Sequence, residues 1–327
     1  NLCVADLFET QAKNNPKSFA LQDIDGRKYK YKETLNRVLK IANIFINKGI
    51  KPKDRIAIIS ENRREYLEIE MACAKIGAIL VAINWRLSDD EVNYCINLVK
   101  PKLVILSKKF NKHKKLNSIK NTTLFLLNTN FERQIINSKT YNGRSLGEGE
   151  DILVILFTSG TTGYPKGAKI SHRAFIYRAL YFAFEYNIDK YDTFPAWAPM
   201  FHMASTDLAI GSLLIGGSVA FIDGFNSSKI TSLIKTYKLS WLVLMPGMLE
   251  EYIEFIEAKN IKVKGIKAMG AMADLIPKSQ ITKITKLLDT PYLNSFGSTE
   301  TGMPPASKGV IGINKKIFSL SKMQSSF

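Results

Sequence analysis

The sequence predicts an α/β fold in which helices cover both faces of mostly parallel sheets. Short apolar runs alternate with amphipathic segments of helical period, which is typical of parallel strands joined by crossover helices. The polar stretch Asn128–Glu150 separates two such units, which we place at residues 1–127 and 151–305, followed by an unmatched tail at 306–327. The chain has 327 residues, of which 46% are hydrophobic, so it can build two compact units.

In the first unit the sequence predicts alternating helices and strands. Apolar residues recur with a period near 3.6 in the helical segments, and Gly49 and Gly77 follow two of them. The predicted helices are Val4–Asn14, Tyr31–Lys48, Arg64–Ile76 and Asp89–Leu98. The predicted strands are Phe19–Asp23, Lys28–Tyr31, Arg55–Ser60, Ala78–Ile83 and Leu103–Leu106.

The second unit continues the alternation. It opens with the apolar strand Asp151–Phe157 and then contains the predicted elements Arg173–Tyr186, Ser218–Ile222, Ser228–Tyr237, Trp241–Met245 and Met248–Lys259. The nearly uncharged stretch Leu208–Ile222 is interrupted by glycines and is shorter than the ~20 residues of a membrane span. We therefore interpret it as a buried helix, a turn and a strand.

The formal net charge of +17 raises the question of a nucleic-acid or membrane partner. Most of the lysines are dispersed, and the one dense cluster, within Lys100–Lys120, carries no interleaved aromatic residues. We expect a solvated surface loop there and no nucleic-acid partner. Attraction to phosphorylated substrates, or peripheral association with anionic lipid surfaces, remains as the alternative.

The cysteines and histidines favour neither disulfides nor a zinc site. Cys3, Cys73 and Cys95 are widely spaced, and the last two lie in apolar surroundings, as buried thiols do in a reducing cytoplasm. The three histidines, His113, His172 and His202, are too scattered for zinc by spacing. We expect a cytoplasmic protein.

The strongest local signal is a glycine- and hydroxyl-rich loop directly after an apolar strand. Its residues are Thr158, Ser159, Gly160, Thr161, Thr162 and Gly163, followed by Pro165, Lys166 and Gly167. Glycines let the backbone approach a ligand closely, so that amides and hydroxyls can converge on phosphate oxygens. Lys166 adds a mobile charge suited to β- and γ-phosphates. P-loop NTPases require Gly-Lys-Ser/Thr instead, so this is a different phosphate loop.

The motif Thr-Ser-Gly-Thr-Thr-Gly-Tyr-Pro-Lys-Gly resembles the signature of the adenylate-forming superfamily, which includes acyl-CoA synthetases, peptide-synthetase adenylation domains and firefly-type luciferases. Four further segments resemble other motifs of that superfamily in order and spacing. They are Ile76–Ser88, Pro199–His202, Ala268–Met272 and Phe296–Glu300. The resemblance implies a fold of two mostly parallel sheets with flanking helices, layered αβαβα.

This resemblance also implies roles for single residues. Lys166 and the loop would hold the ATP phosphates, Thr299 the α-phosphate, and Glu300 a Mg²⁺ ion. Phe296, in place of the usual tyrosine, would stack on adenine. The remaining nucleotide contacts would come from Gly270, Ala271, Met272, Ser295, Gly297 and Ser298.

The substrate would then be a carboxylic acid that attacks the α-phosphorus and releases pyrophosphate. His202 would lie between ATP and the acyl pocket and steer the carboxylate. The pocket would draw on Phe201, Met203 and Ser205, and this apolar lining favours a fatty or aryl acid. The parent activity would be that of an acyl-CoA ligase, with ATP, Mg²⁺ and coenzyme A as the co-substrate of the full-length enzyme.

Members of the superfamily continue well beyond the Thr-Glu motif, with a ribose-binding aspartate, a hinge and a mobile C-terminal domain. None of these is recognisable after Gly302. We therefore expect a truncated N-terminal domain from which the β-barrel subdomain and the lid domain are largely missing. The alternatives are a nucleotide- or acyl-binding remnant without turnover, or an interaction protein that uses the basic surface.

Overall fold

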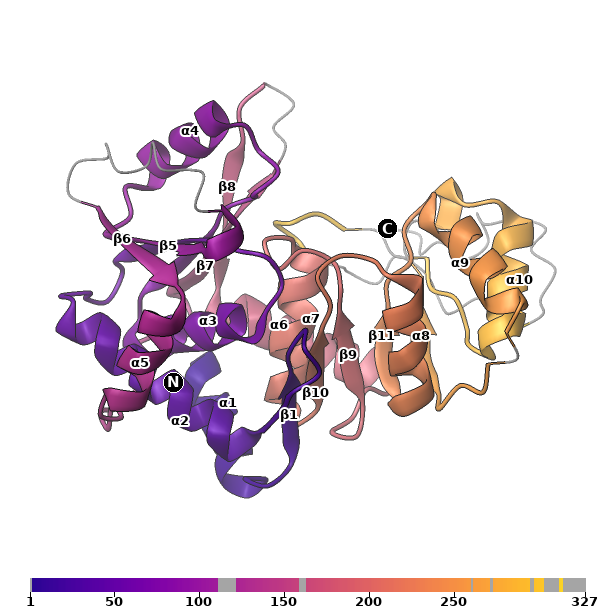
Figure 1. The fold of residues 1–327 in the computed structure, drawn as a ribbon, viewed down its shortest axis with the longest axis horizontal. Helices are drawn as coiled ribbons and strands as arrows, with labels where there is room; N and C mark the ends of the chain where they lie inside the picture. Colours follow the sequence, from indigo (N-terminus) through magenta and orange to yellow (C-terminus); the bar gives the residue numbers. More distant parts are fainter. Residues whose placement is uncertain are drawn as a thin grey trace.

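A computed structural model describes residues 2–110, 122–158, 163–259, 261–270, 273–294, 297–302 and 312–313. Within these residues the chain forms two six-stranded sheets with helices between and around them (Figure 1). This confirms the predicted α/β class with two mostly parallel sheets.

Sheet B, mainly from the first half of the chain, has the strand order β6-β5-β3-β4-β7-β8. Its neighbours pair in parallel, except for the antiparallel pair β7 and β8. The strands are β3 (Arg55–Ile59), β4 (Ile79–Ala82), β5 (Leu103–Ser107), β6 (Thr123–Leu127), β7 (Ile152–Thr158) and β8 (Lys166–Ser171).

Sheet A has the order β12-β11-β9-β10-β1-β2, and only β1 and β2 run antiparallel. Its strands are β1 (Phe19–Gln22), β2 (Lys28–Lys30), β9 (Thr193–Ala196), β10 (Ser218–Phe221), β11 (Leu239–Leu242) and β12 (Ile266–Met269). Strand β1 therefore pairs with a strand nearly two hundred residues further along the chain.

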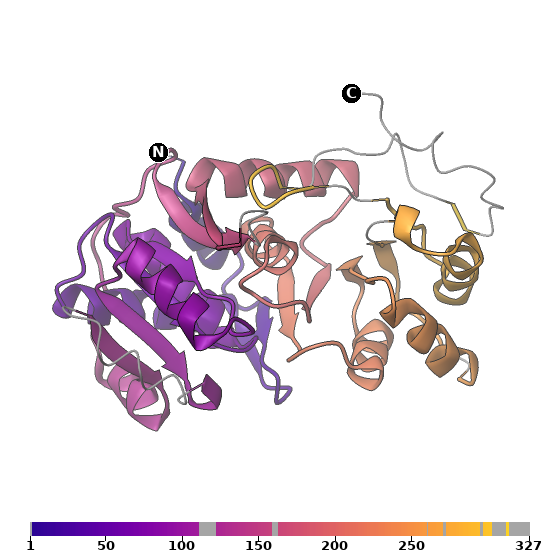
Figure 2. The same cartoon turned by 90° about the horizontal axis from the view of Figure 1, so that it is seen from above.

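Within the described residues five helices pack between the two sheets, and four others cover the outer faces (Figures 1 and 2). The inner helices are α1 (Val4–Asn14), α2 (Tyr31–Asn47), α3 (Arg64–Ile76), α6 (His172–Glu185) and α7 (Met203–Leu214). The outer helices are α4 (Asp89–Val99), α8 (Ser227–Thr236), α9 (Met248–Glu257) and α10 (Lys278–Leu288). Helix α5 (Thr129–Asn137) packs against α2 and β6 and buries Phe131 and Ile135 in the large core, so it lies on the same face of sheet B as the inner helices. Short 3₁₀ helices occur at η1 (Lys108–Phe110) and η3 (Ala273–Leu275).

Alternate side chains of the sheet B strands enter two different cores. Ile56 and Ile58 join the large core shared with the inner helices, whereas Ala57 and Ile59 join the smaller core under α4. Both faces are buried, which explains the nearly continuous apolar runs of these strands.

One prediction differs from the structure. The stretch Asn128–Glu150, predicted as a polar separator, contains the helix α5, which is capped by the Asn128 side chain and buries Phe131 and Ile135. The sheets also cross the predicted units, because β1 and β2 join sheet A while β7 and β8 join sheet B. The division into 1–127 and 151–305 itself stays a prediction. Across the described ranges, none of the helices is both long and apolar enough to cross a bilayer.

Asn62 joins the carboxyl ends of the two sheets. It follows β3 of sheet B and is 2% exposed. Its Nδ2 donates to the carbonyls of Ala196 at 3.0 Å, Ala198 at 2.7 Å and Ile222 at 3.2 Å, and its Oδ1 accepts from the amide of Met200 at 2.9 Å. Ala196 is the last residue of β9, and the other partners follow β9 or β10 of sheet A. One carboxamide therefore satisfies four buried backbone groups at the junction.

His172 lies fully buried at the start of α6. Its Nδ1 accepts a hydrogen bond from the amide of Val4 at 3.2 Å, so in the neutral ring Nε2 carries the proton. Burial lowers the pKa of His172 to about 4, despite the opposing charges of Asp151 and Asp6. The ring is therefore neutral in the folded protein at pH 7.

We expect replacement of Asn62 by alanine to lower the free energy of unfolding by on the order of 1–3 kcal/mol, because buried backbone groups lose their partner. Urea unfolding would measure it. Asn43→Ala is the matched control, since Asn43 makes a single side-chain hydrogen bond, to Ser138; we expect it to cost less than about 1 kcal/mol. Equal losses in the two variants would contradict the junction role.

His172 makes stability pH-dependent in a defined direction. In the unfolded chain the ring has an ordinary pKa near 6.5, so as the pH falls the unfolded state takes up a proton before the folded state does. The contribution of His172 to the free energy of unfolding is therefore fully present above pH 6.5 and is lost as the pH falls towards 4. At pH 5 the free energy of unfolding should be lower by about 2 kcal/mol than at neutral pH through this group.

Urea unfolding at pH 7.5 and pH 5 would measure this loss in the wild type and in His172→Asn, whose side-chain oxygen can accept the Val4 hydrogen bond. Other titrating groups are common to both proteins, so we expect the variant to lose about 2 kcal/mol less over this range. Identical pH slopes would rule out His172 as the source.

Candidate functional site

The predicted phosphate loop joins β7 to β8 at one edge of sheet B. Thr158 ends β7 and pairs with Lys166, which begins β8 and is exposed. Gly163 has a φ of +94°, a conformation that favours glycine, and nothing lies within 4 Å of where a Cβ would be. Ser159, Gly160, Thr161 and Thr162 lie outside the described residues. Because β7 runs parallel to β4 and β3, the loop follows the carboxyl end of a parallel strand.

The flanks of this loop pack against the start of α4. They form a cavity of about 130 Å³ lined by Asn84, Leu87, Glu91, Phe157, Thr158, Gly163 and Pro165. The rings of Tyr94 and Tyr164 lie 4.7 Å apart beside it. Contacts from α4 therefore support the flanks of the loop.

His202 caps the inner helix α7. Its Nδ1 accepts from the amide of Ala204 at 3.2 Å, so the neutral ring carries its proton on Nε2. Partial burial of the ring lowers the pKa of His202, and the positive charge of Arg86 lowers it further. At neutral pH the side chain is thus an uncharged donor that remains exposed to solvent.

The loop that carries His202 also contacts sheet B through aromatic rings. Phe201 lies edge-on to Trp85, which follows β4, with ring centroids 6.0 Å apart. Phe201, Met203 and Ser205 are all buried. Their assignment to an acyl pocket stays a prediction.

Gly270 directly follows β12 and has a conformation that requires glycine. Its φ is +134°, and a Cβ would lie 2.3 Å from the carbonyl oxygen of Leu293. Its amide donates to the carbonyl of Leu242 at 3.0 Å, which continues the pairing with β11. The neighbouring Ala271 and Met272, predicted to line adenine, lie outside the described residues.

Residues Gly297–Gly302 form a compact turn beside α6 (Figure 2). The Ser298 hydroxyl accepts from the Thr301 amide at 3.2 Å, and the Gly302 amide donates to the Ser298 carbonyl at 2.9 Å. Thr299 is half-buried and Glu300 is exposed. Ser295 and Phe296 lie outside the described residues.

The residues present fit a magnesium site in which the protein and the phosphates of ATP both supply ligands to the ion. Glu300 offers an exposed carboxylate that makes no ion pair in the described ranges. Mg²⁺ is commonly held by one or two carboxylates together with waters and substrate phosphates. The described residues contain no group of three or more His, Cys, Asp or Glu side chains that could hold a metal by themselves.

The two sheets bring part of the predicted site to facing edges. Asn62 and Trp85, after β3 and β4, contact the segment after β9 that carries His202. The loop flank at Thr158 follows β7, the strand next to β4. In parallel α/β sheets, ligands bind at the carboxyl ends of the strands, which is where these residues lie.

Sequence reasoning missed Asn62, Arg178 and Asp207. Arg178 lies within α6, and its Nη2 donates to the carbonyls of Thr299 at 3.2 Å and Glu300 at 3.1 Å. Asp207 was detectable as the single charge in the apolar helix α7. Asn62 offered no comparable signal, because an asparagine between a strand and a helix is common.

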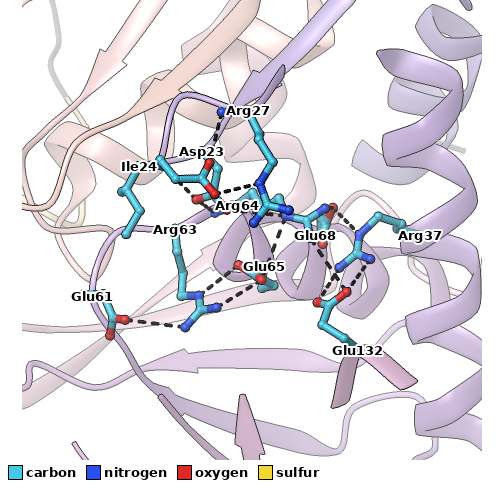
Figure 3. Close-up of polar contacts among 11 residues, drawn as sticks. Asp23, Ile24, Arg27, Arg37, Glu61, Arg63, Arg64, Glu65, Glu68 and Glu132 are labelled. Carbon is cyan, nitrogen blue, oxygen red and sulfur yellow. Dashed lines mark hydrogen bonds and ion pairs between the residues drawn. The ribbon is translucent and has the colours of Figure 1, made fainter. Parts of the chain in front are cut away.

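The larger cavities contain none of the predicted site residues. Cavities of about 420 and 870 Å³ adjoin the turn between β1 and β2, and both are lined by Arg27 and Arg64. Figure 3 shows the surrounding arginines paired with carboxylates; for example, Arg37 contacts both Glu68 and Glu132. With its guanidinium groups already neutralised, this region is poorly suited to nucleotide phosphates.

Comparison with known proteins places this geometry in a family. The family model described as AMP-binding enzyme matches residues 8–313. The 2-succinylbenzoate–CoA ligase of Listeria innocua is 24% identical over 85% of this chain, and the fatty acid–[acyl-carrier-protein] ligase ScoC of Streptomyces coeruleorubidus is 26% identical over 86%. The chain spans 56% and 57% of the length of these two relatives.

The fold is shared with solved structures of low sequence identity. The N-terminal domain of FACL13 from Mycobacterium tuberculosis superposes with a TM-score of 0.83 at 21% identity, covering 91% of this chain and 76% of that one. The ATP-bound MatB of Rhodopseudomonas palustris gives a TM-score of 0.82 at 21% identity, covering 93% of this chain and 64% of that one. Since the family model covers most of the sequence, this chain belongs to the AMP-binding enzyme family.

Proposed function

We propose that this protein binds ATP at the Thr158–Gly167 loop and activates a carboxylic acid as an acyl-adenylate, with release of pyrophosphate. The observation that carries the proposal is the glycine-containing loop at the carboxyl end of β7, with the exposed Lys166 at its far side. Membership of the AMP-binding family supports acid activation in general, since its relatives here are named as ligases of acids to CoA or to a carrier protein.

The chemistry asks for positioning and charge neutralisation rather than a protein nucleophile. A carboxylate oxygen bonds to the α-phosphorus while the bond from that phosphorus to the bridging oxygen breaks, and pyrophosphate leaves with the electron pair. Lys166 would neutralise the departing phosphates, and Nε2 of His202 would donate to the acid. Mg²⁺, held by Glu300 when bound, would supply further positive charge at the phosphates.

The finer assignments belong to the same proposal. We infer a fatty or aryl acid as the substrate, because Phe201 and Met203 flank His202 with apolar side chains. We infer coenzyme A as the acceptor for a protein of the relatives' length. Carboxylate-dependent exchange of labelled pyrophosphate into ATP, over a panel of fatty, aryl and amino acids, tests activation directly, and no exchange with any acid would contradict it.

Replacement of Lys166 by alanine should weaken ATP binding by about 1.5–3 kcal/mol, which is roughly tenfold to 150-fold, because a charged hydrogen bond to phosphate is lost. Isothermal titration calorimetry with ATP and Mg²⁺ would measure it. Lys169→Ala is the matched control, since Lys169 is also exposed on β8. A similar loss in both variants would point to general charge attraction rather than a phosphate contact.

His202 should act through Nε2 without carrying a charge. Asparagine is a good helix N-cap and can accept the Ala204 hydrogen bond, so we expect His202→Asn to leave the melting temperature nearly unchanged. It should nevertheless weaken binding of dodecanoyl- or benzoyl-sulfamoyl adenosine, which mimic the acyl-adenylate, and leave AMP binding unaltered.

Because the pKa of His202 is lowered from 6.5, its ring stays neutral as the pH rises from 7 to 8. The ratio of wild-type to His202→Asn affinity for these analogues should therefore be constant over that range. A ratio that changes steeply between pH 7 and 8 would show that the ring titrates there, contrary to this assignment.

A further inference from the structure

A line of buried charged side chains connects the inner helices to the turn that carries Thr299 and Glu300. Arg178 on α6 is 10% exposed in its side chain, and its Nη1 donates to Oδ2 of Asp207 on α7 at 2.9 Å. The Nη2 of the same guanidinium donates to the backbone carbonyls of Thr299 and Glu300 at 3.2 and 3.1 Å. One side of the guanidinium thus faces a buried carboxylate and the other faces the turn.

We propose that Arg178 is a positioning residue, which fixes the Thr299–Glu300 backbone so that both side chains are presented to the α-phosphate and its metal ion. This inference rests on the proposed function. Arg178 need not touch ATP, because its contacts are to the main chain of the two residues that would.

The turn depends on Arg178 for its attachment to the inner helices. Hydrogen bonds inside Gly297–Gly302 join Ser298, Thr301 and Gly302 to one another. In the part of the chain that the structure describes, the hydrogen bonds that tie this turn to another element come from Arg178. Without the guanidinium the turn would keep its internal hydrogen bonds but lose its fixed position relative to α6.

Close packing at Gly302 shows that the arginine side chain is part of the turn. Gly302 has a φ of +73°, and a Cβ there would lie 2.6 Å from Nε of Arg178. The backbone therefore passes directly over the arginine side chain, at a distance that only glycine permits.

Asp207, and not the buried Glu70 on α3, is the charged partner of Arg178. Glu70 accepts a hydrogen bond from the Thr206 hydroxyl at 2.8 Å, and burial raises its pKa to about 8, with the charge of Asp207 adding to the shift. Glu70 is therefore largely protonated at pH 7. Burial raises the pKa of Asp207 to about 6, against the lowering effect of Arg178, so at pH 7 Asp207 is largely an anion that accepts a charged hydrogen bond from the guanidinium.

The test is a double-mutant cycle between Arg178 and Glu300 in the full chain. Calorimetry would give the affinity for ATP in Mg²⁺ and in EDTA for the wild type, Arg178→Gln, Glu300→Gln and the double variant. We expect Arg178→Gln to remove most of the Mg²⁺-dependent gain in affinity, roughly tenfold, and to add little once Glu300 is replaced. A merely structural arginine would lower the melting temperature without this coupling.

Two further variants keep the result interpretable. Arg178→Lys retains a charge for Asp207 but lacks the planar fork, so it should fold and still lose the Mg²⁺-dependent gain. Arg173→Gln is the matched control on α6, because Arg173 pairs at the surface with Glu150; we expect it to bind like the wild type.

The possible failures are distinguishable. Unchanged Mg²⁺-dependent affinity in folded Arg178→Gln or Arg178→Lys, or additive losses in the cycle, would overturn the positioning role while ATP binding stands. A wild-type chain that binds no ATP with or without Mg²⁺ would overturn the proposed function and this inference with it.

Discussion

The hydrogen bonds of one buried carboxamide hold the carboxyl ends of the two sheets together. Asn62 belongs to sheet B, yet its side chain completes backbone groups at the carboxyl ends of β9 and β10 in sheet A. Parallel strands end in exposed carbonyls and amides that need partners once they are buried. Because these ends are paired across the junction, the segment that carries His202 has a defined position relative to the end of β3 in sheet B.

The layer between the sheets imposes a second constraint, because it contains charge. All of α3 is buried, including Glu68 and Lys75. Each of these has an ion-pair partner from another helix: Arg37 on α2 for Glu68, and Glu9 on α1 for Lys75. An unpaired buried charge costs several kcal/mol, so these pairs restrict how the inner helices can be arranged. The same layer carries Arg178 and Asp207, which connects the packing of the core to the Thr299–Glu300 turn.

Much of the fold was predictable from periodicity, and the failures have physical causes. Helices α1 and α3 begin and end at the predicted residues because their apolar spacing is regular and Gly77 ends α3 in a left-handed conformation. Strand β8 was missed because Lys166–Ser171 mixes lysines and small residues on an edge strand, where burial imposes little pattern. Sheet membership could not be predicted either, since parallel pairing of β1 with β10 leaves no local signal.

The candidate site likewise has one part that was predictable from the sequence and one part that was not. The phosphate loop was predictable because its chemistry lies in consecutive residues. Arg178 was not, because its role depends on Asp207, 29 residues away, and on Thr299, 121 residues away. A residue that acts through long-range contacts has no sequence neighbourhood that identifies it.

The pairing of β1 with β10 also orders the assembly of the protein during synthesis. The strands of sheet B lie between residues 55 and 171, so that sheet has all its strands once residue 171 has been made. The N-terminal hairpin of β1 and β2 is synthesised first but must wait for residues 218–221 before it gains its partner. Long-range parallel pairing is intrinsically slow, and an unpaired strand edge favours aggregation. Strand β1 is thus exposed without its parallel partner until β10 has been made.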